Sequence, residues 1–303
     1  MVNLNLHTFF EKCNECFRNF EKINHVCFVC TNNNYCRTCN ESDNCAKCLD
    51  RIHYNHTSEN ITYNCNRIIY RYVLQYFNRF CSEIYYEVSP FVNQFTDDDI
   101  NIVSIGCGPN SELYGIIEAF RVNEQTKNIH YYGFDTNRVW IPIWTINQQL
   151  LDGDHLSQEY PKEDPSTYFA ANDIGEIDLF VMNYLLSDIS RQDAESKEAA
   201  IQSICNLILQ IKPKVLLYND ISYYTNKPNS GYGCLISIVK RLAEHELSFS
   251  CKRFLTFHGP TFYMPANITF GQSQLYFTRP TCVANIVTTC ASCASTQLLF
   301  VRK

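Results

Sequence analysis

The segment 101–110, which reads NIVSIGCGPN, constrains this chain more than any other stretch of its sequence. An apolar run rich in β-branched residues ends there at two closely spaced glycines, and apolar residues at helical spacing follow at once. This pattern predicts a strand, a tight turn and a helix. Glycines in such a turn let a nucleotide-like ligand lie against bare backbone at the N-terminus of the helix.

A lone carboxylate leads to the same interpretation. A second predicted strand, 129–134, ends at Asp135 in the sequence YYGFDTN. A carboxylate at the end of that strand can accept both hydrogen bonds of a ribose diol. The turn and the acid together predict a site for a nucleotide cofactor.

The order of four motifs resembles that of class I S-adenosylmethionine-dependent methyltransferases. The first motif of that family ends a strand with a short G-x-G turn, here GCGPN, and the second is an acid that Asp135 matches. The third is an acid before a loop, matched by Asp173 in YFAANDIGE, and the fourth is the strand IDLFVM, which runs into Asn183 and Tyr184. The resemblance covers residues 96–303.

The resemblance implies a doubly wound, mostly parallel, seven-stranded α/β sheet that closes with an antiparallel hairpin. Alternating strand and helix patterns predict the same layout, with a polar loop over 158–166 and a third strand just before Asp173. The resemblance also implies S-adenosylmethionine as cofactor. The expected cofactor-binding residues are Gly106, Cys107, Gly108, Asn110, Asp135, Asp173 and Asn183.

Asn110 departs from the pattern of the family, because a third glycine is common at this position. Asn tolerates positive φ and is a good helix N-cap, so we expect the turn to form. The competing interpretation is a nicotinamide-binding Rossmann domain, whose G-x-G-x-x-G pattern requires glycine where Ser111 stands. A further alternative is a fold that kept the turn and lost the cofactor.

The acceptor side of the site is less constrained by the sequence. Methyl transfer from a sulfonium is an in-line displacement that needs alignment and, for some acceptors, removal of a proton, so no single residue type is required. The expected catalytic residues are Asp220, Asn183 and Tyr184, with Asp220 as general base. Asp188 and Asn219 are further candidates near strand ends. The alternative role for Asp220 is that of a helix cap or turn residue.

Cysteine pairs dominate the first 50 residues. Eight of the 17 cysteines form four C-x-x-C pairs there, namely Cys13, Cys16, Cys27, Cys30, Cys36, Cys39, Cys45 and Cys48. Such a pair lets two thiolates reach one metal ion from a tight turn, so four pairs predict about two Zn²⁺ ions. A sequential and an interleaved pairing both remain open, and His53, His56 and Cys65 are additional candidate ligands.

These patterns predict three parts: a zinc-binding module over 1–66, a helical connector over 67–95 and a methyltransferase-like domain over 96–303. Apolar residues spaced by three and four over 67–88 predict an amphipathic helix. We expect this helix either to pack over the domain core or to line the cofactor or substrate cavity with its Tyr and Arg side chains.

Composition narrows the function. The net charge of −6 argues against a protein whose whole surface binds nucleic acid nonspecifically. No apolar run approaches the ~18 residues of a membrane span, and the N-terminus lacks a signal-peptide core, so we expect a soluble, cytoplasmic protein with no membrane partner. The predicted function is methyl transfer from S-adenosylmethionine to a macromolecular acceptor, RNA or protein, which the zinc module selects. The alternative is a zinc-finger interaction protein with an inactive methyltransferase-like domain.

Overall fold

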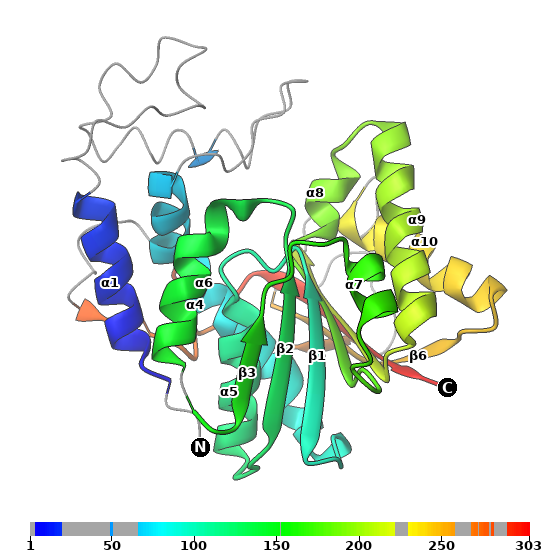
Figure 1. The fold of residues 1–303 in the computed structure, drawn as a ribbon, viewed down its shortest axis with the longest axis horizontal. Helices are drawn as coiled ribbons and strands as arrows, with labels where there is room; N and C mark the ends of the chain where they lie inside the picture. Colours follow the sequence, from blue (N-terminus) through cyan, green and yellow to red (C-terminus); the bar gives the residue numbers. More distant parts are fainter. Residues whose placement is uncertain are drawn as a thin grey trace.

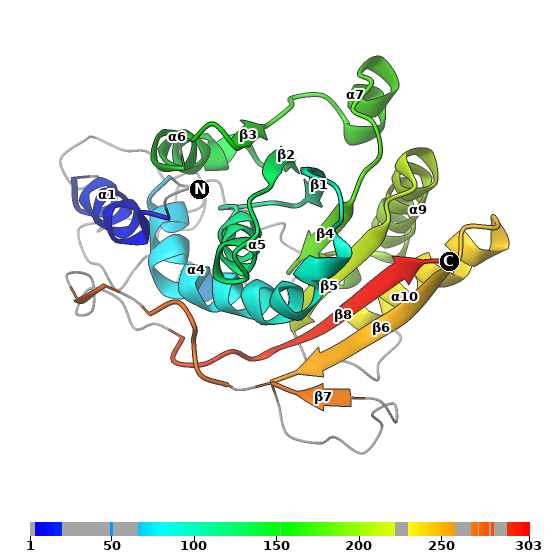
Figure 2. The same ribbon diagram turned by 90° about the horizontal axis from the view of Figure 1, so that it is seen from below.

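The computed structural model describes residues 4–19, 49–50, 66–151, 153–221, 230–257, 268–271, 273–278, 280–281 and 290–303. Within these ranges the chain forms one twisted sheet with helices on both faces (Figures 1 and 2). The predicted α/β fold with a mostly parallel sheet is therefore confirmed.

The sheet runs in the order β3-β2-β1-β4-β5-β8-β6-β7. Its strands are β1 (Asp99–Ile105), β2 (Asn128–Phe134), β3 (Leu156–Glu159), β4 (Leu179–Asn183), β5 (Val215–Ile221), β6 (Phe249–Thr256), β7 (Ile268–Phe270) and β8 (Ser295–Arg302). The first five strands pair in parallel, whereas β8 is antiparallel to both β5 and β6. The antiparallel closing pair was expected, and the short strand β7 adds an eighth strand to the predicted seven.

The helices form two layers (Figure 2). One layer holds α1 (Leu6–Asn19), α4 (Asn66–Val88), α5 (Ser111–Val122) and α6 (Ile141–Leu150), and the other holds α7 (Pro165–Ala171), α8 (Leu186–Ser190), α9 (Ala194–Ile211) and α10 (Gly231–Glu244). Two short 3₁₀ turns, η2 (Ser89–Gln94) and η3 (Arg138–Trp140), precede β1 and α6. No helix in the described part of the chain is long and apolar enough to cross a membrane.

A hydrophobic core lies on each face of the sheet, because successive strand residues point to opposite faces. Ile102 of β1 packs with the layer of α4 and α5, and Val103 packs with the layer of α9 and α10. The approach of α4 to α5 depends on Gly115, where an added Cβ would lie 2.6 Å from the carbonyl oxygen of Cys81. The predicted helix over 67–88 is confirmed, and it begins at Asn66.

The expected third strand immediately before Asp173 was wrong. That position holds the helix α7, which begins at Pro165 and is capped by Asp164, whose carboxylate accepts hydrogen bonds from the N–H groups of Ser166 and Thr167. The third strand is β3, and its end falls inside the predicted polar loop. Because β3 is a short edge strand with alternate residues exposed, its pattern resembled a loop.

The helix α1 lies within the predicted zinc module but packs into the core beside α4. Its Phe9 ring lies 4.6 Å from the ring of Phe77 and 5.5 Å from that of Tyr114. Cys13 and Cys16 stand on this helix, one turn apart, and not in the tight turn that we expected. The structure therefore places at least this segment with the sheet domain. The remaining boundary of the module stays a prediction.

Candidate cofactor and acceptor site

The glycine turn after β1 has the left-handed backbone that its sequence predicts. Gly106 and Gly108 have φ values of 63° and 47°, and Asn110 adopts φ 63° as well. The positive φ at position 106 favours glycine, and an added Cβ would also lie 2.7 Å from Cδ1 of Leu185, whose side chain would have to move. The turn is fixed to β2 by the N–H of Cys107, which donates to the carbonyl of Phe134 at 3.1 Å.

Asp135 lies directly beside this turn. Its carboxylate accepts the N–H of Gly108 at 3.0 Å and the N–H of Asn137 at 2.7 Å. Burial raises the pKa of Asp135 to about 6, against the opposing effect of these two donors. The structure therefore brings together the two motifs that are well separated in the sequence, at the carboxyl ends of adjacent parallel strands.

Aromatic side chains from η3, α6 and the end of β3 surround the turn. The Trp144 indole N–H donates to the carbonyl of Gly108 at 2.7 Å, and its ring stacks on Tyr160 at 4.8 Å. The hydroxyl of Tyr160 bonds to the side chain of Asn110. The predicted capping role of Asn110 was wrong, because its side chain makes no cap bond to α5 and contacts this ring system instead.

Glu112 is a buried acid that the sequence interpretation missed. It stands in the first turn of α5, and its carboxylate accepts hydrogen bonds from Ser104 and Tyr131, each at 2.6 Å. Burial raises its pKa, and the four hydrogen bonds that stabilise the carboxylate oppose that effect. An acid in the first turn after a glycine turn is favoured by the helix dipole. The sequence alone shows Glu112 only as part of the helix pattern.

A chain of hydrogen bonds links the ends of β4 and β5. Asn219 donates to the side-chain oxygen of Asn183 at 2.8 Å, and Asn183 donates to Ser111 at 3.1 Å and to Glu112 at 3.4 Å. Asn183 and Asn219 are direct partners in the parallel register. Thus Asn183 connects the acceptor side of the site to the helix that follows the glycine turn.

Tyr184 follows Asn183 with a left-handed backbone (φ 55°). Its hydroxyl accepts from Arg79 at 3.0 Å and donates to Glu83 at 2.9 Å, and both partners come from α4. The ring of Phe80 lies 4.0 Å from the ring of Tyr184. The helix therefore places an Arg and an aromatic ring at the end of β4 and packs over the core, as the first of the two interpretations expected, whereas its lining of a cavity stays a prediction.

The structure gives Asp220 the contacts of a cap. One carboxylate oxygen accepts the N–H of Ser187 in α8 at 2.8 Å, and the other accepts its neighbour's N–H, that of Ile221, at 2.7 Å. The side chain is fully buried, which raises its pKa to about 6. Asp188, in contrast, is exposed, and its charge raises the pKa values of Asp135, Asp220 and the buried Tyr72 of α4.

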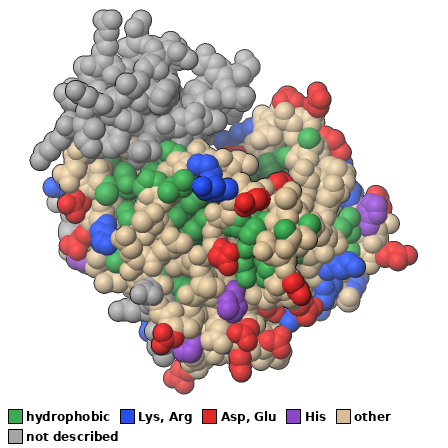
Figure 3. Space-filling model, in the orientation of Figure 1, with side chains coloured by type: hydrophobic (Ala, Val, Ile, Leu, Met, Phe, Trp, Pro, Cys, Tyr) green, Lys and Arg blue, Asp and Glu red, His purple; other side chains and the backbone are tan. Residues whose placement is uncertain are grey.

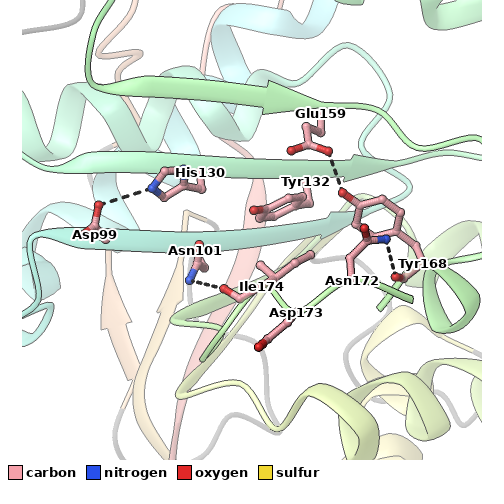
Figure 4. A pocket seen from close by; sticks show the side chains of 9 residues that line it. All are labelled: Asp99, Asn101, His130, Tyr132, Glu159, Tyr168, Asn172, Asp173 and Ile174. Carbon is pink, nitrogen blue, oxygen red and sulfur yellow. Dashed lines mark hydrogen bonds and ion pairs between the residues drawn. The ribbon is translucent and has the colours of Figure 1, made fainter. Parts of the chain in front are cut away.

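Asp173 does not join this site. It lies in the segment between α7 and β4, whose carbonyls at Ile174 and Glu176 accept from the side chain of Asn101 in β1. Asn101 precedes Gly106 by five strand residues, which corresponds to about 16 Å along the strand. Asp173 is exposed on the opposite side of the sheet from α4 and α5 (Figure 4).

The predicted metal ligands lie mostly outside the described residues. This holds for Cys27, Cys30, Cys36, Cys39, Cys45 and Cys48. Among the residues that the structure describes, no three His, Cys, Asp or Glu side chains cluster as metal ligands would. Cys13 is buried on α1. Its burial raises the pKa of its thiol, and the charge of the neighbouring Cys16 adds a smaller effect in the same direction. The zinc sites stay a prediction.

No protein-family model and no curated protein matches the chain. Among solved structures, the chain is similar to a Listeria monocytogenes protein assigned as a class I S-adenosylmethionine-dependent methyltransferase, with 10% identity over 96% of this chain and 88% of that chain and a TM-score of 0.45. It is also similar to the plantazolicin methyltransferase BpumL in complex with SAH, with 11% identity over 98% of this chain and 100% of that chain and a TM-score of 0.42. A third similar structure is precorrin-6y C5,15-methyltransferase from Geobacter metallireducens, with 12% identity over 73% of this chain and 89% of that chain and a TM-score of 0.38. All three TM-scores lie below 0.5, a likeness too weak to support an argument about function.

Proposed function

We propose that this protein is an S-adenosylmethionine-dependent methyltransferase that acts on a macromolecular acceptor. The observation that carries the proposal is the glycine turn after β1, hydrogen-bonded to Asp135 after β2. Both lie at the carboxyl edge of a sheet whose last strand in the sequence, β8, is antiparallel to its neighbours. In open α/β sheets ligands bind at that edge. The mostly parallel sheet, its antiparallel closing pair and the glycine turn agree with what the motif resemblance implied.

The residues around the turn fit a cationic nucleoside cofactor. Left-handed glycines leave backbone without Cβ atoms beside Asp135. Asp135 lies beside the turn and Glu112 stands in the first turn of the helix that follows it, so the glycine turn is bordered by acidic side chains. Such a field favours a positively charged sulfonium over a neutral or anionic ligand. When bound, S-adenosylmethionine supplies the activated methyl group.

The protein's own residues divide the remaining tasks. We assign the turn of Gly106–Cys107–Gly108 and Asp135 to cofactor binding, and Asn183 with Tyr184 to orienting the acceptor. Arg79 and Glu83 hold the hydroxyl of Tyr184 in place. Asp220 accepts the N–H of Ser187 in α8, which supports its alternative role as a cap. We assign Asp173 no role in cofactor binding, because it lies on the side of the sheet opposite α4 and α5.

The zinc module is proposed to select the acceptor, as the sequence suggested, with about two Zn²⁺ ions held by the eight cysteines. A zinc-binding interaction protein is the second candidate, and one observation favours it. Both oxygens of Asp135 and both of Asp220 already accept backbone N–H groups, so neither acid depends on a ligand for its hydrogen bonds.

Transfer of a labelled methyl group separates the two candidates. The full chain is incubated with tritiated S-adenosylmethionine and a cell extract, and the labelled product is treated with RNase or with protease. We expect label in a macromolecule that one of the treatments releases. An Asp135→Ala variant is the matched control and should lose most of this label. Absence of transfer, in a protein that binds the cofactor, would favour the interaction protein.

A further inference from the structure

A groove lies on the sheet face opposite α4 and α5, away from the glycine turn (Figure 4). Its volume is about 480 Å³, and its walls come from β1, β2, β3 and the segment from α7 to β4. The crossover between β3 and β4 holds only the seven-residue α7, which packs against α9. The outward side chains near the start of β1 and β2 therefore stay exposed, 66% for Asp99 and 37% for His130.

The groove carries three acids, and its one imidazole, His130, lies against Asp99. Asp99, Glu159 and Asp173 line it from three different segments, and no lining residue is Lys or Arg. Among the described residues, each carboxylate accepts its hydrogen bonds through a single oxygen. Asp99 accepts from Asn128 and His130, Glu159 from the hydroxyl of Tyr168, and Asp173 from a backbone N–H. Each acid thus has a second oxygen that can receive a partner. In the space-filling view, acidic side chains also gather toward the bottom of this face, where β1 and β2 begin (Figure 3).

Aromatic rings complete the walls. Tyr132 and Tyr168 lie 6.2 Å apart at 48° and both border the groove (Figure 4). The alkyl stem of a long basic side chain can pack on such rings, and its charge is attracted to their faces. The groove ends at Glu159, and the next residue, Tyr160, bonds to Asn110 of the glycine turn. A segment bound here therefore docks away from the glycine turn and is connected to it through the end of β3.

We propose that this groove docks a basic peptide segment of a protein acceptor, with a Lys or Arg side chain against Tyr132 and Tyr168 and its charge beside Asp99, Glu159 and Asp173. The partner's role as acceptor rests on the proposed function, whereas the binding itself does not. The phosphate backbone of RNA is repelled by three carboxylates, so the groove favours protein over RNA among the two acceptor classes.

The test measures binding of a fluorescent (Arg-Gly)₄ peptide to the full chain by anisotropy at low salt, beside an (Glu-Gly)₄ peptide and a single-stranded RNA octamer. We expect the basic peptide alone to bind. The triple variant Asp99→Asn, Glu159→Gln and Asp173→Asn should weaken that binding about tenfold, since exposed ion pairs are individually weak. The matched control Glu195→Gln, Glu244→Gln and Glu246→Gln neutralises three exposed acids elsewhere and should change binding less than about twofold.

Two results would overturn the proposal: peptide binding that the triple variant retains in full, or tighter binding of the RNA than of the basic peptide. Thermal unfolding checks that the triple variant folds. If it does not fold, the single Glu159→Lys variant takes its place, and we expect the same tenfold loss of peptide binding. Calorimetry with S-adenosylmethionine on the same proteins separates the two claims. A chain that binds the peptide through the groove and does not bind the cofactor would refute the proposed function and leave the groove standing.

Discussion

Burial affects the pKa values of the acids at the strand ends more than any charged partner does. Asp135 and Asp220 both have pKa values raised to about 6, and in each case burial is the largest cause. Backbone N–H groups act in the opposite direction but do not cancel it. Asp220 is the clearer case, because the side chain is fully buried and caps the start of α8.

The Asp220 shift makes stability depend on pH. Its folded pKa is above the unfolded value of 3.8, so the folded state binds the proton more tightly, and the group destabilises the protein as pH rises from about 4 to 6. The shift corresponds to about 3 kcal/mol as an upper bound. Relative to Asp220→Asn, the native chain should therefore lose about 1–3 kcal/mol of unfolding free energy between pH 4 and pH 7. Urea unfolding at both pH values measures this, and a difference that does not change with pH would contradict it.

At the scale of elements, local chemistry predicted some features well and long-range contacts decided the others. The turn at Gly106 and the helix of α4 follow from glycine conformation and apolar spacing, and both could be predicted from the sequence. The strand β3 has only four residues with alternate exposure, so nothing local separated it from a loop. We expected Asp173 to follow the third strand, but it follows the helix α7. A motif match alone does not say at which end of the sheet an acid lies.

The hydrogen-bond partners on the acceptor side of the site could not be predicted, because they come from distant parts of the sequence. Glu112, Arg79 and Glu83 were visible only as helix residues, and their hydrogen-bond partners lie as far as 211 positions away in the sequence. Asp220 resembled a free carboxylate after a strand, whereas the cap that it forms depends on where α8 begins. Approximate strand ends could thus be predicted from the sequence, and the hydrogen-bond partners of the acids could not.

The packing of α1 gives a prediction at the same scale. Phe9 is fully buried against Phe77 and Tyr114, so Phe9→Ala should reduce the unfolding free energy by about 3–5 kcal/mol. Val122 of α5, which is 42% exposed, provides the control, and Val122→Ala should change stability by no more than about 0.5 kcal/mol. Equal stability of the two variants in urea would show that α1 does not pack on the sheet domain.

At the scale of the whole molecule, the chain combines a sheet domain with a cysteine-rich segment. The structure joins Cys13 and Cys16 to the domain through α1, so the metal sites that these cysteines are expected to form would be tied to the core. The helix α1 packs beside α4, the helix that also supplies Arg79 and Glu83 to Tyr184.

Metal analysis tests the predicted zinc module. Protein purified without chelator should contain about two Zn²⁺ ions per chain, and Cys36→Ser should lower that to about one while the sheet domain stays folded. Circular dichroism of the variant serves as the control for folding. Iron in place of zinc, or protein without metal, would refute the zinc module.

Calorimetric titration of the full chain with S-adenosylmethionine is the decisive measurement for the cofactor assignment. We predict one binding site per chain, weakened by about 1.5–3 kcal/mol in Asp135→Ala, the range for a hydrogen bond to a charged group. Asp173→Ala should leave the affinity unchanged, because the structure places that acid on the other face of the sheet. Equal affinity in native protein and Asp135→Ala, or tight binding of NADH in place of S-adenosylmethionine, would contradict the assignment.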